Sequence, residues 1–137
     1  MAGAVVSGFP STAWTLLEGG DPLEGGRALG RVLLPREQRT LVLLAAGAPV
    51  HLALSLGWAG VLGAVLPERD EPALATLGGL AIAGLDLAVL GRFFAPITAL
   101  PQGRQWADHV AFGLSVGVVL RATRRAGRRP RPRTAAG

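Results

Sequence analysis

The stretch LVLLAAGAPVHLALSLGWAGVLGAVL, residues 41–66, is 26 residues long and contains no Asp, Glu, Lys or Arg. A membrane-spanning helix needs about 20 mainly apolar residues, and at about 1.5 Å per residue this stretch makes a helix of about 39 Å. Because that exceeds the apolar thickness of a bilayer, we expect the helix to tilt or to kink, with Pro49 inside it. The stretch predicts a membrane-spanning helix.

Three other apolar segments flank this one, at residues 2–17, 73–94 and 105–121. The segment 73–94 is long enough to span, and its apolar part carries one charge, Asp86. The first segment and the last are borderline, at about 16 apolar residues each, so each one either spans or dips in and returns. A signal peptide is disfavoured for the first segment, because it lacks a positive start and contains Pro10. The sequence predicts an all-α integral membrane protein, a bundle of about four transmembrane helices.

The overall composition agrees with this class. Of the 137 residues, 50% are apolar and 17% are charged, whereas a soluble domain carries about 25% charged residues. The absence of cysteine excludes disulfides, thiolate metal sites and cysteine nucleophiles. No Walker lysine, HExxH, GxSxG or paired catalytic carboxylates occur, so we expect neither an enzyme nor a bound metal or cofactor.

The positive charge is concentrated at one end of the chain. All 14 basic residues are Arg, and seven of them lie between Arg121 and Arg133. The segment 122–137 is therefore predicted to be a disordered basic tail that attracts anionic lipid and does not bind a specific nucleic acid. Six Arg fall on one side of a four-span arrangement and eight on the other, which leaves the orientation open.

The connectors divide the segments. Within the charged, glycine-rich stretch 18–39, Arg27 and Arg31 lie four residues apart, which predicts a short interfacial helix. The sequence PERDEP, residues 67–72, predicts a tight turn between the second and third segments. These two segments should therefore be antiparallel neighbours.

That arrangement brings an intramembrane polar pair to one depth. His51 lies just before the middle of the second segment and Asp86 just past the middle of the third. A carboxylate in hydrocarbon costs at least about 2.5–3.5 kcal/mol, so Asp86 needs a partner or a proton. The pair is either a structural clamp or a proton relay, and the clamp is favoured because no third group accompanies it. Trp58, inside the second segment, is predicted to pack in the core.

Two further features mark the last segment. Asp108 and His109 form a polar entrance, and His109, Gly113 and Gly117 follow at four-residue spacing. The GxxxG pair predicts helix packing against either the Ser7–Ser11–Thr15 stripe of the first segment or a second copy of the chain. Haem ligation by the two histidines is disfavoured, because they lie at depths of about 16 Å and about 6 Å along their helices.

The run Asp108–Gly113, with Gly117 and Arg121, resembles the closing helix of small bacterial inner-membrane proteins of the YagU-like kind. The stretch Val50–Trp58 is similar to four-helix membrane proteins from GC-rich bacteria. The resemblance implies a four-helix plan and a multi-pass location in the bacterial cell (inner) membrane. It implies no activity.

The predicted function is a structural or accessory, non-enzymatic role for a multi-pass membrane protein. Self-association or a membrane-protein client is the expected partnership, besides the lipid bilayer. The alternative is a small transporter or proton-conducting protein that uses the His51–Asp86 pair.

Overall fold

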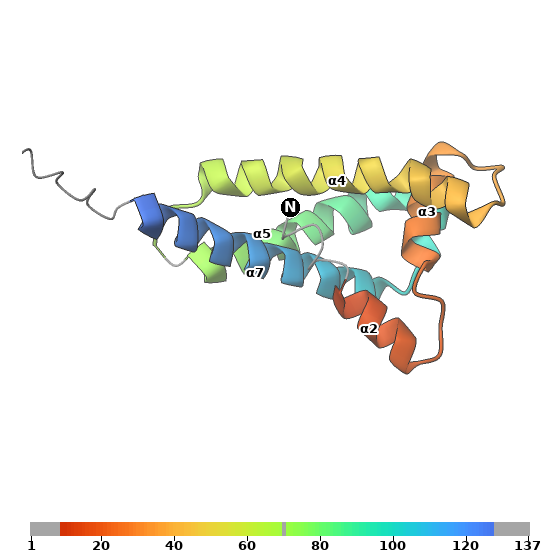
Figure 1. Cartoon of the computed structure of the whole chain (residues 1–137), viewed down its shortest axis with the longest axis horizontal. Coiled ribbons are helices and arrows are strands. Elements are labelled where there is room, and N and C mark those ends of the chain that lie inside the picture. The colour runs from red at the N-terminus through yellow and green to blue at the C-terminus, as the bar shows by residue number, and fades with distance from the viewer. Residues whose placement is uncertain (1–8, 70, 128–137) are drawn as a thin grey trace, which may run out of the picture.

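The computed structural model describes residues 9–69 and 71–127, and all the regular elements in these ranges are helical (Figure 1). In chain order they are α2 (Phe9–Leu17), α3 (Glu24–Leu33), α4 (Thr40–Val65), α5 (Glu71–Ala83), η1 (Gly84–Leu90), η2 (Gly91–Phe93), α6 (Ala95–Thr98) and α7 (Gln102–Gly127). The segment η1 is π-helical and η2 is a turn of 3-10 helix, so 71–93 is one continuous helical stretch. The all-α prediction is confirmed for the described residues.

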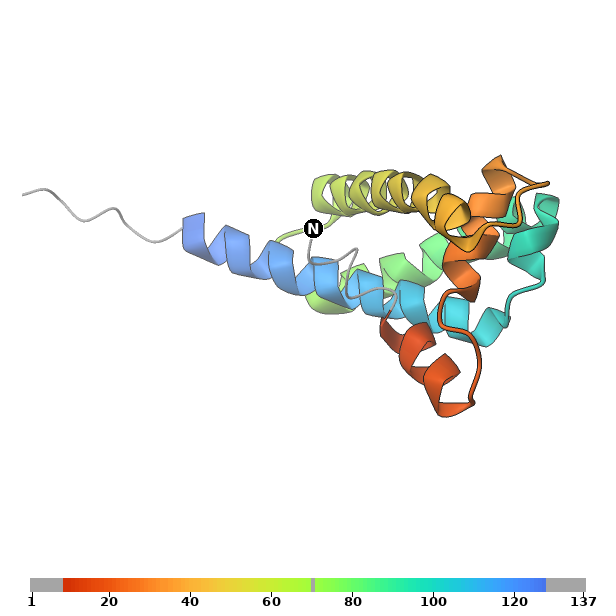
Figure 2. The same cartoon turned by 45° about the vertical axis from the view of Figure 1, so that its right-hand side comes forward.

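Three long helices run along the molecule, with α4 at one edge and α5 crossing α7 (Figure 1). The short helices α2 and α3 gather at the end where α7 begins, and both views show the last turns of α7 projecting at the opposite end (Figures 1 and 2). Side chains from the three long helices meet in one apolar cluster, formed by Leu62, Ile82, Phe112 and Val116. This cluster joins the C-terminal half of α4 to the α5–α7 pair.

Helix α4 covers almost the same residues as the predicted second segment, and it continues through Pro49. It ends where Leu66 donates its backbone N–H to the Leu62 carbonyl at 3.0 Å and takes up an extended conformation. The residue before a proline disfavours the α conformation, so Pro67 explains why the helix stops there.

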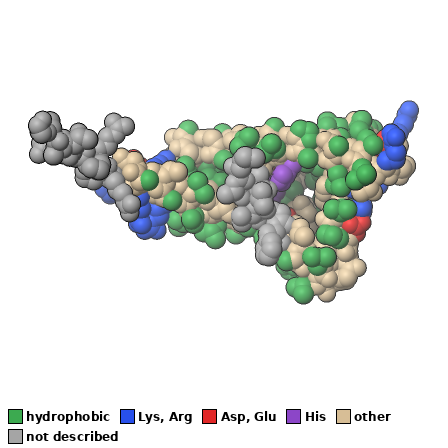
Figure 3. Space-filling model, in the orientation of Figure 1, with side chains coloured by type: hydrophobic (Ala, Val, Ile, Leu, Met, Phe, Trp, Pro, Cys, Tyr) green, Lys and Arg blue, Asp and Glu red, His purple; other side chains and the backbone are tan. Residues whose placement is uncertain are grey.

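Two helices, α4 and the stretch 71–93, are long and apolar enough to cross a membrane. Only 11% and 22% of their apolar windows are buried inside the protein, whereas the core helix of a soluble protein would be mostly buried. Figure 3 shows apolar side chains over the middle of the molecule and arginine side chains at both ends. The large apolar side chains exposed on these helices include Leu52, Leu54, Leu56, Val61, Leu77 and Val89. Such a surface suits lipid better than water.

The remaining predicted segments differ from the structure in extent. The first, 2–17, is helical from Phe9 to Leu17, and residues 2–8 lie outside the described part. The third begins at Glu71 and changes to π-helix at Gly84. The last helix runs to Gly127, so the predicted tail 122–137 is helical over its first six residues, and the rest lies outside the described residues.

Helices α5 and α7 approach each other closely because glycines line their contact. A Cβ added to Gly79 would lie 3.2 Å from the Gly113 Cα, and one added to Gly117 would lie 2.6 Å from the Glu71 carbonyl oxygen. The early residues of α5 therefore face the later residues of α7, and the two helices are antiparallel. Gly113 and Gly117 are buried in this contact, so their partner is α5 and neither the first segment nor a second copy.

Helix α3 coincides with the short helix predicted around Arg27 and Arg31. It packs on the first turns of α4, where a Cβ on Gly47 would lie 2.9 Å from the Gly26 carbonyl oxygen. Leu43 of α4 is completely buried beneath it. The small residues thus dock α3 across the start of the first long helix.

Candidate functional site

Asp86 lies in the π-helical segment η1. The N–H of Gly91 donates to the Asp86 carbonyl oxygen five residues earlier, which widens the helix at this turn. Short π-helical turns occur often at functional sites, where they shift side chains out of regular α-helical register. The sequence predicts a helix over 73–94 and does not indicate this π-helical turn.

The Asp86 side chain meets one polar group from each of the other two long helices. Trp58 Nε1 of α4 donates to Asp86 Oδ2 at 3.0 Å, and His109 Nε2 of α7 lies 3.6 Å from the same oxygen. The Asp86 and His109 side chains are 20% and 21% exposed. We call these three residues the Asp86 cluster. It is the one place among the described residues where α4, η1 and α7 share a polar contact.

A backbone contact sets the tautomer of His109. Its Nδ1 atom lies 2.8 Å from the carbonyl oxygen of Gln105, one turn earlier on α7. A carbonyl oxygen only accepts hydrogen bonds, so Nδ1 carries a hydrogen. The other ring nitrogen, Nε2, is the atom that faces the carboxylate.

The predicted His51–Asp86 pairing is corrected here, because the histidine beside Asp86 is His109. The physical reason is that α5 packs much more closely on α7 than on α4. His51 is exposed on α4 and acts electrostatically on the Asp108 carboxyl. Asp108 in turn accepts a hydrogen bond from the backbone N–H of Ser11, at 2.8 Å.

Further polar contacts hold α2 on the start of α7. Arg104 donates to the Thr15 hydroxyl at 2.8 Å and forms an ion pair with Glu18. Glu18 also accepts from Trp14 Nε1 at 2.7 Å. Asp108, predicted as part of a polar entrance, therefore lies at the junction of α2 and α7, and His109 lies deeper, in the Asp86 cluster.

Arg124 forms a contact at the opposite end that the sequence did not predict. It donates to the carbonyls of Gly63 at 2.9 Å and Leu66 at 3.2 Å, and it lies 3.6 Å from a Glu71 oxygen. Glu71 is only 4% exposed. The sequence predicts that Arg124 lies in a disordered tail, and the acidic residues of PERDEP, Glu71 among them, are the signal that could have pointed to a basic partner.

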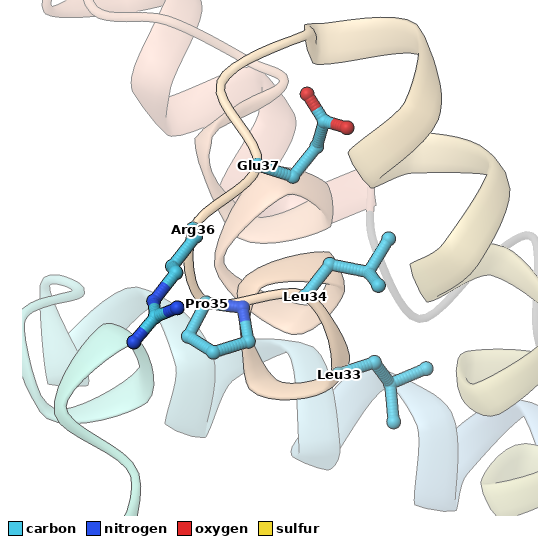
Figure 4. A pocket seen from close by; sticks show the side chains of 5 residues that line it. All are labelled: Leu33, Leu34, Pro35, Arg36 and Glu37. Atoms are coloured by element: carbon cyan, nitrogen blue, oxygen red, sulfur yellow. The ribbon is translucent and has the colours of Figure 1, made fainter.

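A shallow hollow lies at the α3–α4 connector. Figure 4 shows its lining, which comes from one run of chain, Leu33, Leu34, Pro35, Arg36 and Glu37. Glu37 is already engaged, since two hydrogen bonds with the Arg39 guanidinium lower the pKa of its carboxyl to about 2. The hollow gathers no nucleophile, and its one carboxylate is held by Arg39.

Nothing in the described residues resembles a metal centre, since no three His, Asp or Glu side chains come together there. Comparison with known proteins found no matching family model, no curated relative and no solved structure with a significant match. The functional argument therefore depends on the Asp86 cluster and on the distribution of charge.

Proposed function

We propose that this chain is a multi-pass membrane protein with a structural, non-enzymatic role, which crosses the bilayer through α4, the stretch 71–93 and α7. The placement of charge supports three crossings. Between Arg39 and Glu68 there is no charged residue, and between Glu71 and Arg92 there is only Asp86.

Helix α7 fits the same plan, although it is less apolar. Between Arg104 and Arg121 its only acidic residue is Asp108, over 16 residues or about 24 Å of helix. Arginine side chains at both ends can reach the headgroups, which extends the usable length. The helical part of the first segment, Phe9–Leu17, has nine residues and is too short to cross alone. Whether 2–8 completes a fourth crossing lies outside the described residues.

The single observation that carries the structural role is the Asp86 cluster. Trp58, Asp86 and His109 join three helices through one carboxylate oxygen. Polar contacts between helices in lipid are worth roughly 0.6 kcal/mol each on average and up to about 1.7. A clamp of this kind fixes which helices are neighbours and in which register.

Replacement of Asp86 tests the clamp. Asp86→Asn keeps an oxygen that accepts from Trp58, whereas Asp86→Ala removes it. We expect thermal stability in detergent to fall for Asp86→Ala, by about 1–2 kcal/mol, and to fall less for Asp86→Asn. Equal stability of all three proteins would contradict the clamp.

The crossings are tested by labelling. The chain has no cysteine, so single cysteines can be placed at Gln38, Glu68, Ala99 and Ala126 without background. Three crossings predict that an impermeant maleimide labels 38 and 99 from one side of sealed vesicles and 68 and 126 from the other. If 126 labels with 99, α7 does not cross.

Two partner proposals accompany this role. Arg121 and Arg125 are exposed on the last turns of α7, where they can bind anionic headgroups. Self-association cannot use Gly113 and Gly117, which are covered by α5. An exposed alternative is the face of α4 that carries Ala53, Gly57, Gly60 and Ala64. A change of oligomeric state on Gly57→Leu, and not on Leu77→Ala, would support that face.

A further inference from the structure

Asp86 and His109 can bind one proton between them in addition to the hydrogens already used in the hydrogen bonds of the Asp86 cluster. The indole N–H of Trp58, the only donor of that side chain, donates to Asp86 Oδ2, and the Nδ1–H of His109 donates to the Gln105 carbonyl oxygen. Oδ2 and Nε2 remain facing each other at 3.6 Å. One proton placed on either of them makes the pair neutral overall.

A neutral pair is the form that a bilayer tolerates. A lone carboxylate, or a lone imidazolium, is costly in hydrocarbon, whereas a pair that holds one shared proton carries no net charge. The proton can lie on the carboxyl, beside a neutral imidazole, or on Nε2, beside a carboxylate. Transfer breaks the Oδ2–H bond and forms the Nε2–H bond, and no other bond changes.

We infer that Asp86 and His109 form a proton-binding site, reached from the end of the molecule where α2 lies. This goes beyond the structural role proposed above, and it depends on the geometry of the same cluster. The expected ligand is a proton delivered by water, not a metal ion or an organic substrate.

The groups around the pair define the route of access. On α7, Asp108 is the next residue to His109 and acts on it electrostatically. On α4, His51 is exposed and acts on Asp108. From α2 the backbone N–H of Ser11 donates a hydrogen bond to Asp108 Oδ1 at 2.8 Å.

Two charged residues near the start of α7, Arg104 and Glu18, are paired with each other. Neither therefore provides a free titratable group beside the Asp86–His109 pair. Among the described residues, the titratable side chains that connect Asp86 to the surface are His109, Asp108 and His51. These side chains lie on the side of the Asp86 cluster that faces the α2 end. The side that faces Arg124 is filled by apolar residues, namely Leu62, Ile82, Phe112 and Val116.

Trp58 provides a direct probe, because its indole N–H donates a hydrogen bond to the Asp86 carboxyl. In the background Trp14→Phe/Trp106→Phe it is the sole tryptophan of the chain. Its fluorescence is recorded in detergent and in phosphatidylcholine vesicles from about pH 2.5 to about pH 9, a range that brackets the ordinary pKa values of Asp and His. We expect a titration in this range.

Matched variants assign that titration. Asp86→Asn keeps the acceptor for Trp58 but cannot ionise, so the titration should be lost or reduced to that of His109 alone. His109→Gln should move the midpoint, because the carboxyl then has no basic partner. Gln38→Ala, far along the chain on the α3–α4 connector, serves as the control and should leave the midpoint unchanged. Should Asp86→Asn fail to fold, Asp86→Glu replaces it and should move the midpoint.

Two outcomes would overturn the inference. The first is fluorescence of Trp58 that does not change with pH in the parent background. The second is an unchanged titration in both Asp86→Asn and His109→Gln. The structural role fails separately, through unchanged stability of Asp86→Ala, so the two proposals can be distinguished.

Discussion

Gly117→Ala tests the feature that holds α5 against α7. Gly117 is buried in the contact, and its neighbours across the interface are mostly backbone atoms at the start of α5. Backbone atoms in a helix cannot rotate away, unlike the end of a flexible side chain. An added methyl group must therefore separate the two helices.

The geometry sets the size of the effect. The new Cβ would lie 2.6 Å from both the Glu71 carbonyl oxygen and the Pro72 Cα, and 2.9 Å from the Ala75 Cβ, where ordinary contact begins at 3.4 Å. The helices must separate locally by about 0.8 Å. Overpacking of this kind costs about 1–3 kcal/mol, and the higher helix propensity of Ala returns about 0.5–1 kcal/mol. We expect a net loss of up to about 2.5 kcal/mol, and a stability about 1–3 kcal/mol below that of an alanine substitution that meets no contact.

The assay is reversible unfolding in mixed micelles, followed by far-ultraviolet circular dichroism as the fraction of denaturing detergent increases. Gly103→Ala is the matched control, because it lies on the same helix and a Cβ there would meet nothing within 4 Å. Its stability should be unchanged or slightly higher. If Gly117→Ala is as stable as Gly103→Ala, the close α5–α7 contact is refuted.

Two other predictions concern the ends of the molecule. Arg124→Ala leaves Glu71 buried without its cation and should lower stability by about 1–3 kcal/mol, whereas the exposed Arg125→Ala should change it little; equal effects would contradict the contact. The hydrogen bonds from Arg39 lower the pKa of Glu37 from 4.5 to about 2. Their contribution to the free energy of unfolding is therefore complete above pH 4.5 and is lost as the pH falls toward 2. A carbon-13 carboxyl titration should show that low midpoint, and Arg39→Ala should return it toward 4.5; a parent midpoint already near 4.5 would refute the interaction.

Hydrophobic runs and turn residues made much of the fold predictable. The uncharged stretch 41–66 became α4, and the prolines at its end placed the turn before α5. Arg27 and Arg31, four residues apart, correctly indicated α3. These features are local, since they depend on helix period, proline geometry and run length, all of which are visible in one segment at a time.

The partner of Asp86 could not be read in the same way. The sequence prediction paired Asp86 with His51 because the two residues lie at equal depth along consecutive helices. That pairing assumes that consecutive helices pack together and stay regular. The structure breaks both assumptions, because α5 packs on α7 and becomes π-helical at Gly84. Asp86 therefore reaches His109 and Trp58, and Trp58 combines the predicted core position with a polar bond that hydrophobicity does not reveal.

Small residues explain why α7 is the neighbour. In lipid, apolar side chains do not favour one helix over another, because the surrounding chains are equally apolar, so close approach and polar bonds decide. Helix α5 presents Ala75, Gly79 and Ala83 at four-residue spacing, all buried, and α7 presents Gly113 and Gly117 at the same spacing. Two such rows allow backbones to touch, whereas Gly57 and Gly60 of α4 have no neighbour within 4 Å of an added Cβ. Comparison of small-residue rows between helices, instead of chain order, would have placed α7 beside α5 and brought His109 to Asp86.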